Sequence, residues 1–214
     1  MKHPPPILSL EAFSARVTEA ADWCPSKGVA EALYAHFQEL LRWNRRLSLI
    51  GPGTLEEIPE RHFGESLQAL PWIPLGARVV DVGSGGGFPG LVLAIARPDL
   101  LVTLVESQQA KWAFLRAAAR ASGASVSCIH DRMGPSLPAE LEEEQIDSIT
   151  LRAVRLPPPV WSLLVSRLSE RGRVLIWAGL EEPALPSSLR RLERVPLTGS
   201  QRRQLLVYGR STGG

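Results

Sequence analysis

A dense cluster of glycines at residues 81–90 is the part of this sequence whose residue types most directly suggest chemistry. The segment reads D-V-G-S-G-G-G-F-P-G and begins at the end of the short apolar run 78–82. Glycine adopts positive φ angles and lets a ligand approach the backbone, but it costs chain entropy unless this backbone shape is required. The segment therefore predicts a ligand-binding turn after a strand, and a glycine turn without a ligand is the alternative.

Two cofactor classes bind turns of this kind, dinucleotides and S-adenosylmethionine. A dinucleotide site has G-x-G-x-x-G directly after the strand. Counted from Gly83 the sixth residue is Phe88, and the pattern fits only from Gly85, two residues late. Asp81 stands in front of the glycines, where it would repel a pyrophosphate but could face the cationic methionine end of S-adenosylmethionine. We therefore interpret the turn as an S-adenosylmethionine site, with a dinucleotide site as the alternative.

A second acidic residue supports a nucleoside-containing cofactor of either class. Glu106 ends the next predicted strand, where a carboxylate can hold the hydroxyls of a ribose. From the residues alone, we expect the cofactor to contact Asp81, Gly83, Gly85, Gly87 and Glu106.

Alternating strands and helices from residue 78 onward would position this turn. Apolar strands are predicted at 78–82, 100–106, 125–130, 146–151 and 173–178. Helices are predicted between them at 89–96, 110–121 and 160–169. Repeated strand–helix units predict an α/β fold with a mostly parallel sheet, and segments 194–197 and 204–209 predict an antiparallel hairpin at its edge. Ligands bind such sheets beyond the carboxyl ends of the strands, which is where the glycine segment lies.

The first 70 residues have a purely helical pattern. Apolar residues at helical spacing predict a helix that begins after Ser9, a second over 29–44 and a third over 56–70. Breaks fall at 24–28 and at Pro52-Gly53. We expect an N-terminal helical cap over residues 1–70 and a cofactor-binding domain over 71–214, together one compact unit.

The composition is that of an ordinary soluble protein, with 44% hydrophobic and 21% charged residues. The absence of a long apolar run and of a signal-peptide core predicts a cytoplasmic protein that does not bind membranes. Cys24 and Cys128 lack metal-ligand spacing, so no metal site is expected. The cations are nearly all arginines, and their clusters fit either nucleic-acid phosphates or a solvated surface. From composition alone the solvated surface is favoured.

The motifs together resemble the bacterial 16S ribosomal RNA guanine-N7 methyltransferases, the glucose-inhibited division protein B family, over nearly the whole chain. Residues 43–50 resemble the family's W-N-x-x-x-N-L-T-x-I stretch, and residues 61–67 resemble R-H-x-x-D-S-L. Residues 81–90 resemble D-x-G-[ST]-G-x-G-F-P-G, whose F-P-G ending is the most specific part. Residues 106–115 resemble D-S-x-x-K-[KR]-x-x-F-L, and residues 152–154 resemble S-R-A.

The resemblance implies a class I (Rossmann-like) methyltransferase sheet with a small helical cap, S-adenosylmethionine as cofactor and 16S ribosomal RNA or the small ribosomal subunit as substrate. We expect the protein to act as a monomer. The implied cofactor contacts are Gly83, Phe88, Glu106, Met133, Gly134 and Arg152. Arg152 and Arg132 are the implied catalytic residues. Contacts to RNA are expected from Arg45, Arg46, His62, Lys111 and Arg203.

Several of these roles have structural alternatives. Arg152 could instead pair with the acidic run 142–144, and His62 could be a packed core histidine. The family's motif residues are also replaced at three positions, where a glutamate and two basic residues give way to Gly134, Ala178 and Ala110. A methyltransferase that acts on a small molecule or a protein, or a cofactor-binding member without RNA methylation, is therefore the alternative function.

Guanine N7 carries a free lone pair and no proton, so its methylation requires no general base. Catalysis would then consist mainly of placing N7 in line with the methyl group. This chemistry suits a sequence in which no constellation of proton-transfer residues is evident.

Overall fold

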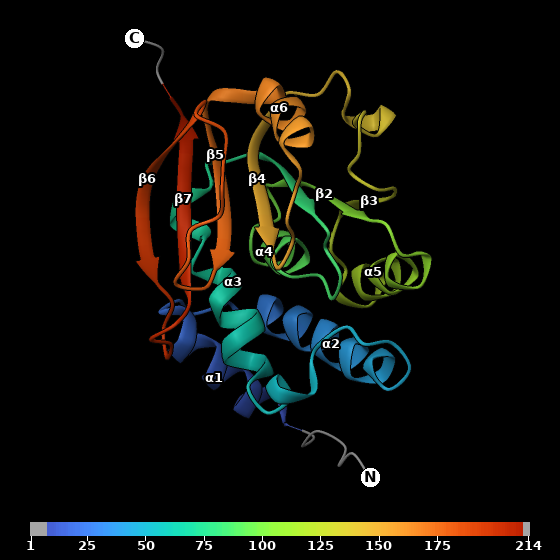
Figure 1. Cartoon of the computed structure of the whole chain (residues 1–214). Coiled ribbons are helices and arrows are strands. Elements are labelled where there is room, and N and C mark those ends of the chain that lie inside the picture. Colours follow the sequence, from blue (N-terminus) through green and yellow to red (C-terminus); the bar gives the residue numbers. More distant parts are fainter. Residues whose placement is uncertain (1–7, 212–214) are drawn as a thin grey trace.

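The chain builds one mixed β-sheet with helices around it (Figure 1). The computed structural model describes residues 8–211. Seven strands lie in the order β3-β2-β1-β4-β5-β7-β6. Their bounds are Arg78–Val82 for β1, Leu101–Glu106 for β2, Val126–His130 for β3, Ile146–Arg152 for β4, Leu168–Ala178 for β5, Leu189–Pro196 for β6 and Gln204–Arg210 for β7. The α/β class predicted from the alternating pattern is confirmed.

The strands from β3 to β5 are parallel, and β7 and β6 add antiparallel pairs at one edge. In Figure 1 the arrows of β4 and β5 point toward the helices of the N-terminal region. The carboxyl ends of the parallel strands therefore face that region, and this is the side on which such sheets bind ligands.

The edge hairpin is longer than the sequence predicts. Strand β6 covers Leu189–Pro196, whereas the pattern indicates only 194–197. Residues 189–193 of this strand are not predicted from the sequence. They include the exposed and charged Arg190 and Arg191, which interrupt the alternation of apolar and polar residues typical of a strand. Glu182 pairs with Arg191 and Arg194, so part of this arginine cluster is neutralised within the protein.

Three helices follow strands of the parallel part. They are α4 over Gly90–Ala96, α5 over Gln109–Ser122 and α6 over Pro158–Arg167. Helix α5 ends at Gly123, whose φ of 69° is the left-handed conformation common after helix ends. Helix α6 ends two positions before the predicted end at 169, because Leu168 already pairs with Ile146 in the sheet.

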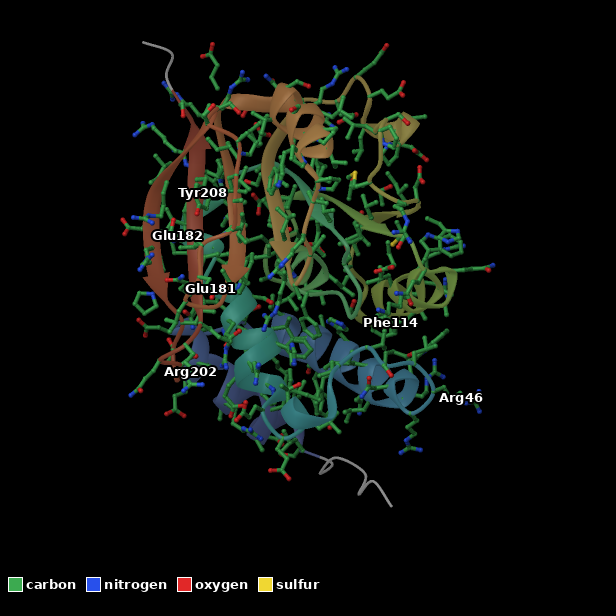
Figure 2. All side chains as sticks on the ribbon, viewed as in Figure 1. Arg46, Phe114, Glu181, Glu182, Arg202 and Tyr208 are labelled. Carbon is green, nitrogen blue, oxygen red and sulfur yellow. The ribbon has the colours of Figure 1, made fainter. Side chains whose placement is uncertain are left out.

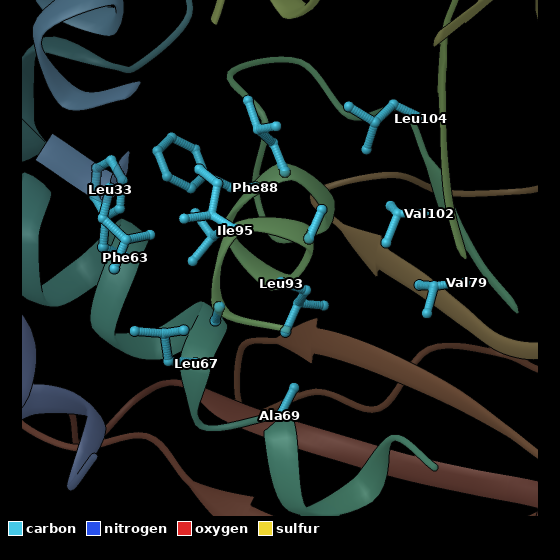
Figure 3. Close-up of a cluster of buried hydrophobic side chains, with 14 of the residues drawn as sticks. Leu33, Phe63, Leu67, Ala69, Val79, Phe88, Leu93, Ile95, Val102 and Leu104 are labelled. Atoms are coloured by element: carbon cyan, nitrogen blue, oxygen red, sulfur yellow. The ribbon is translucent and has the colours of Figure 1, made fainter. Parts of the chain in front are cut away.

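Each face of the sheet carries its own hydrophobic core. One core joins Val79, Val102 and Leu104 of the sheet to α4, α5 and the N-terminal helices. Figure 3 shows Phe88 and Leu93 of this core between sheet residues and Leu33 of the N-terminal region. The second core covers the other face and includes Val80 and Val82 of β1 together with Leu164 of α6.

The N-terminal helices pack at the carboxyl side of the sheet (Figure 1). They are α1 over Leu10–Ala21, α2 over Lys27–Asn44, a π-helix over Ile58–Gly64 and the short α3 over Glu65–Leu67. The predicted cap of α1 is confirmed, since Ser9 Oγ accepts a hydrogen bond from the Ala12 amide at 3.2 Å. The third predicted helix, 56–70, is a π-helix followed by one α-turn, which apolar spacing alone does not distinguish from an α-helix.

Three phenylalanines join the N-terminal helices to one another, and Phe63 continues this cluster to Phe88 of the glycine segment at 5.1 Å. Phe13 stacks on Phe37 at 4.8 Å between ring centroids and meets the edge of Phe63 at 5.0 Å. The division at residue 70 stays a prediction, and the shared core places both parts in contact. Within residues 8–211, no helix is both long and apolar enough to cross a membrane.

Gly64 ends the π-helix where it crosses α1, and this contact is a site where the fold can be tested. A Cβ added at Gly64 would lie 2.5 Å from the Ala20 Cβ. We expect Gly64→Ala to lower the free energy of unfolding by about 1–3 kcal/mol through overpacking. Urea denaturation with an unchanged m-value measures this effect.

Gly28→Ala is the matched control for that substitution. Gly28 lies in the exposed first turn of α2, and a Cβ there has no heavy atom within 4 Å. Helix propensity alone should make the control neutral or more stable by up to about 1 kcal/mol. Equal effects of the two substitutions would contradict the close helix crossing.

Candidate functional site

A cavity of about 600 Å³ opens at the carboxyl ends of β1, β2, β3 and β4. The glycine segment, the residues after β2 and β3, and the segment 152–157 line it. Leu49 contributes from the loop after α2, His62 from the π-helix and Lys111 from α5. The cavity therefore lies where the sequence places the ligand, between the sheet and the N-terminal region.

The glycine turn is held against the next strand by backbone hydrogen bonds. The amides of Gly83 and Ser84 both donate to the Val105 carbonyl, at 2.8 and 3.1 Å. Gly83 has a φ of 71°, and a Cβ added there would lie 2.5 Å from Val154 Cγ2. Gly85 also has a positive φ, of 50°. Both glycines line the cavity, so the turn presents backbone to it.

Glu106 fixes the same turn from the end of β2. Its Oε2 accepts a hydrogen bond from the Gly85 amide at 3.0 Å, and its Oε1 accepts one from the Gln108 amide at 2.8 Å. The side chain lines the cavity although the residue is only 5% exposed. Each carboxylate oxygen has a further lone pair. Glu106 can therefore hold the turn and accept hydrogen bonds from a ligand at the same time.

The structure does not bring Asp81 to the cavity, although a contact with the cationic end of the cofactor is expected from the sequence. Successive side chains of a strand point to opposite faces, so Val82 lines the cavity and Asp81 points away from it. The Asp81 carboxylate is buried, and its Oδ1 accepts a hydrogen bond from Thr150 Oγ1 at 2.6 Å. Its Oδ2 faces Gly90 in the first turn of α4. Asp81 therefore supports the turn from below.

Beneath the glycine turn lies His36, a residue that our sequence reasoning missed. His36 is fully buried, and its Nε2 lies 2.9 Å from the Gly86 carbonyl oxygen. Its ring stacks on Phe88 at 5.2 Å. Burial lowers the pKa of His36 to about 4, so the ring is neutral at physiological pH. The only signal in the sequence is its position on the apolar face of the second helix, beside Leu33, Phe37 and Leu40.

His36 also explains where Gly87 lies. A Cβ added at Gly87 would lie 3.0 Å from the His36 ring, and Gly87 does not line the cavity. The expected cofactor contact of Gly87 is thus replaced by a contact with the N-terminal helices. Gly87 has a φ of 84°, so glycine is required there both for this backbone conformation and for the close approach of the His36 ring.

Two arginines bind one buried carboxylate beside the cavity. Glu65 is 1% exposed, and its Oε2 accepts a hydrogen bond from Arg152 Nη2 at 2.7 Å. Its Oε1 accepts one from Arg203 Nε, also at 2.7 Å. Arg152 Nη2 donates to the Arg61 carbonyl at 2.6 Å as well. Glu65 was not among the expected site residues, although the R-H-x-x-D-S-L resemblance marks an acid at this position.

The Arg152 guanidinium has one donor group that the protein does not use. Arg152 lines the cavity, and its Nη1 is buried without a hydrogen-bond partner among the described residues. Buried donors are almost always satisfied, so this group indicates a ligand with an acceptor atom. The alternative pairing with residues 142–144 is not formed, since Glu144 pairs with Arg78 instead.

His62 lines the cavity beside these arginines. Its Nε2 lies 3.2 Å from Thr54 Oγ1, and its ring centroid lies 5.0 Å from that of Phe88. Burial, together with the positive charges of Arg152, Arg61 and Arg203, lowers the pKa of His62 to about 3. The imidazole is therefore neutral at physiological pH and a very weak base.

The remaining expected residues divide into two groups. Phe88, Lys111, Arg132 and Met133 line the cavity, as do Asp131 and Arg155, which the sequence reasoning did not single out. Gly134 and Arg203 do not line it, and Arg203 reaches the site only through Glu65.

Arg45 and Arg46 lie apart from the cavity. Both are exposed and follow the end of α2. Figure 2 shows Arg46 at the outer end of this helix, on the opposite side of the molecule from Arg202. The arginine clusters of the sequence are therefore spread over separate surfaces.

Comparison with known proteins gives a consistent family. The model of a family described as rRNA small subunit methyltransferase G matches residues 29–184. Ribosomal RNA small subunit methyltransferase G of Desulfotalea psychrophila is 43% identical over 128 residues, which are 58% of each chain. The protein of the same name from Paramagnetospirillum magneticum is 38% identical over 156 residues, 72% of this chain and 73% of the relative. That of Methylobacterium nodulans is 47% identical over 104 residues, which cover 49% of its length.

Solved structures support the fold. MtNAS in complex with MTA and tNA has a TM-score of 0.60 at 13% identity and covers 92% of this chain and 76% of that one. A mutant of MtNAS in complex with S-adenosylmethionine has a TM-score of 0.59 at 14% identity, over 95% and 78% of the two chains. TrmN from Thermus thermophilus has a TM-score of 0.53 at 20% identity, over 72% and 53%. At 13–20% identity these likenesses concern the fold.

The buried position of Asp81 predicts a distinct dependence of stability on pH. Burial raises the pKa of Asp81 from 3.8 to about 6. Between these values the folded protein keeps a proton that the unfolded chain has lost, so this contribution to stability is present below about pH 4 and is lost as the pH rises through 6. Relative to Asp81→Asn, the wild type should lose up to about 3 kcal/mol of unfolding free energy across this range.

Urea denaturation of both proteins at several pH values from 4 to 8 provides the measurement. The lowered pKa values of His36 and His62 make stability rise with pH in the same range, but they act in both proteins and cancel in the difference. If the unfolding free energies of wild type and Asp81→Asn change with pH in parallel, burial does not raise the pKa of the Asp81 carboxyl.

Proposed function

Because the chain belongs to the rRNA small subunit methyltransferase G family, we propose that it transfers the methyl group of S-adenosylmethionine to guanine N7 of 16S ribosomal RNA. The alignments cover 58%, 73% and 49% of the lengths of these three relatives. The activity and the substrate of this chain are therefore part of the proposal, as are the roles of the site residues. The observation that carries the proposal is the unused Nη1 donor of Arg152 on a cavity that the glycine turn also lines.

The residues at the glycine turn fit the proposed cofactor. Gly83 and Gly85 present backbone to the cavity, and Glu106 offers carboxylate lone pairs for ribose hydroxyls. Met133 is buried on the same wall and offers an apolar surface to a nucleobase. When bound, S-adenosylmethionine supplies an electrophilic methyl group on a sulfonium. We assign its binding to Gly83, Gly85, Phe88, Glu106 and Met133, with Asp81 as a supporting residue below the turn.

Arg152 is the residue that we assign to orienting the guanine. Its Nη1 can donate to the guanine O6, which lies next to N7 on the same edge of the base. On the other side of the guanidinium, Nη2 donates to Glu65 Oε2 and to the Arg61 carbonyl, and these two contacts restrict the orientation of the Arg152 side chain. Arg203 shares this carboxylate and completes the support.

The reaction requires no proton acceptor from the protein. Guanine N7 has no proton to lose, and the pKa of His62, about 3, makes this residue unsuitable as a base. The chain instead provides orientation, which can supply a large part of the rate enhancement when the reacting atoms are held in line. His62 is then an uncharged side chain that lines the cavity beside the guanine.

Charged residues around the cavity suit an RNA backbone. Lys111 and Arg132 line it, and among the described residues neither forms an ion pair. Such cations can contact phosphates near an unpaired or flipped guanine. Arg45 and Arg46 lie farther away and would contact more distant phosphates. We infer that the protein acts as a monomer, in the cytoplasm, on 16S ribosomal RNA or on the small ribosomal subunit.

A transfer assay tests the proposed function directly. The purified protein is incubated with methyl-labelled S-adenosylmethionine and either small ribosomal subunits or naked 16S RNA, and the label is mapped. We expect label on one guanosine, released as 7-methylguanine. RNA binding should also weaken steeply as salt rises, because phosphate contacts release counterions. Label in small molecules or proteins, or cofactor binding without transfer, would refute the proposal.

Arg152→Lys tests the assignment of the orienting residue. Lysine keeps the charge next to Glu65 but loses the planar fork. At saturating cofactor we expect kcat/KM for RNA to fall on the order of 100-fold, as for loss of an oriented donor. Unfolding free energy should change much less. Arg78→Lys, at an exposed pair with Glu144, is the control and should keep the wild-type rate. An unaltered rate for Arg152→Lys would remove Arg152 from the site.

A further inference from the structure

Next to the cavity, three flat side chains from α5 and β3 are in contact with one another. We propose that Trp112, Arg116 and His130 form a stacking platform for an unpaired base that neighbours the target guanine in the RNA. The inference rests on the proposed function, and it adds a contact for a second nucleotide. These residues carry none of the roles assigned above.

The indole of Trp112 is fixed in position by the sheet. Its Nε1 donates a hydrogen bond to the Cys128 carbonyl at 3.0 Å, and Cys128 belongs to β3, the strand at the edge of the sheet. The ring therefore bridges α5 and β3. A ring that is held in this way loses little entropy when a ligand stacks on the assembly.

Two exposed groups extend the indole. The His130 ring lies 5.5 Å from the Trp112 ring at an interplanar angle of 29°, and the Arg116 Cζ lies 4.8 Å from a Trp112 ring centroid. Arg116 and His130 are exposed, whereas Trp112 is half-buried. Imidazole and guanidinium planes are both surfaces on which nucleobases stack.

The charge of this surface favours an anionic partner. Within residues 8–211, Arg116 and the nearby Arg120 form no ion pair with a carboxylate. A protein partner would be expected to cover a more apolar centre, depleted in charge. Flat groups combined with unneutralised cations are instead the features that bind single-stranded nucleic acid.

The platform lies next to residues that line the cavity. Lys111 precedes Trp112 and Asp131 follows His130, and both of these neighbours line the cavity. An RNA strand with its guanine in the cavity would pass close to the platform on one side. The base next to the target is the occupant to which we commit.

Fluorescence of 2-aminopurine provides a test that does not depend on methyl transfer. Short single-stranded RNAs carry this base on the 5′ side or the 3′ side of the target guanine. Stacking should quench one of the two probes on the wild-type protein. Replacing that base with an abasic nucleotide should weaken binding about tenfold, within the range measured for base–aromatic stacking.

Three variants distinguish stacking from charge. In Arg116→Ala/His130→Ala and in Trp112→Leu we expect the quenching to disappear and the abasic RNA to bind as well as the intact one. Arg116→Lys keeps the charge but loses the plane, so it should lose part of the quenching. Arg116 and His130 are exposed, so replacing them does not affect the core. The double variant therefore still tests the platform if Trp112→Leu fails to fold.

Arg171→Ala is the matched control, because Arg171 is exposed at the start of β5, away from the carboxyl ends of the strands. It should keep both the quenching and the penalty for the abasic RNA. If the platform variants behave like this control, the platform is refuted even when wild-type protein methylates RNA. If quenching depends on the platform but no guanine is methylated, the platform stands and the proposed function fails. If the wild type binds neither RNA, the platform is refuted, whereas the proposed function is decided by the transfer assay on 16S RNA and small ribosomal subunits.

Discussion

The burial of one carboxylate, Glu65, is the constraint on which the arrangement of this site depends. A buried charge must be paired, and removing a partner from such a pair is strongly destabilising. Glu65 accepts hydrogen bonds from Arg152 at the end of β4 and from Arg203 directly before β7, while its backbone carbonyl accepts one from the Trp177 indole of β5. The N-terminal region is therefore attached to three neighbouring strands at one point, and the Arg152 guanidinium is oriented by the same contact.

A second attachment lies on the other side of the cavity. His36 holds the Gly86 carbonyl, and Phe88 packs between His36 and His62. The glycine turn thus has side chains of the N-terminal helices beneath it and the Glu106 carboxylate beside it. The backbone shape required by a cofactor is imposed by contacts from both parts of the protein.

Much of this architecture could be predicted from local patterns. Short contiguous segments determine the order of strands and helices and the position of the glycine turn. The π-helix, the side to which Asp81 points and the place of Gly87 depend on tertiary contacts. Asp81 and Val82 are neighbours in β1 and point to opposite faces of the sheet. The sequence does not show which of the two side chains faces the cavity. Glu65 and His36 are polar residues on apolar helix faces, and their partners are distant in the sequence. Their roles required the three-dimensional arrangement.

The pair formed by Glu65 and Arg203 joins residues 138 positions apart. During synthesis the N-terminal helices emerge first, and the Glu65 carboxylate lacks its second guanidinium until Arg203, the residue before β7, has left the ribosome. Contacts of such long sequence separation are slow to form. A nascent chain that stops short of Arg203 therefore leaves one oxygen of the buried Glu65 carboxylate without its guanidinium, and the support for Arg152 is incomplete.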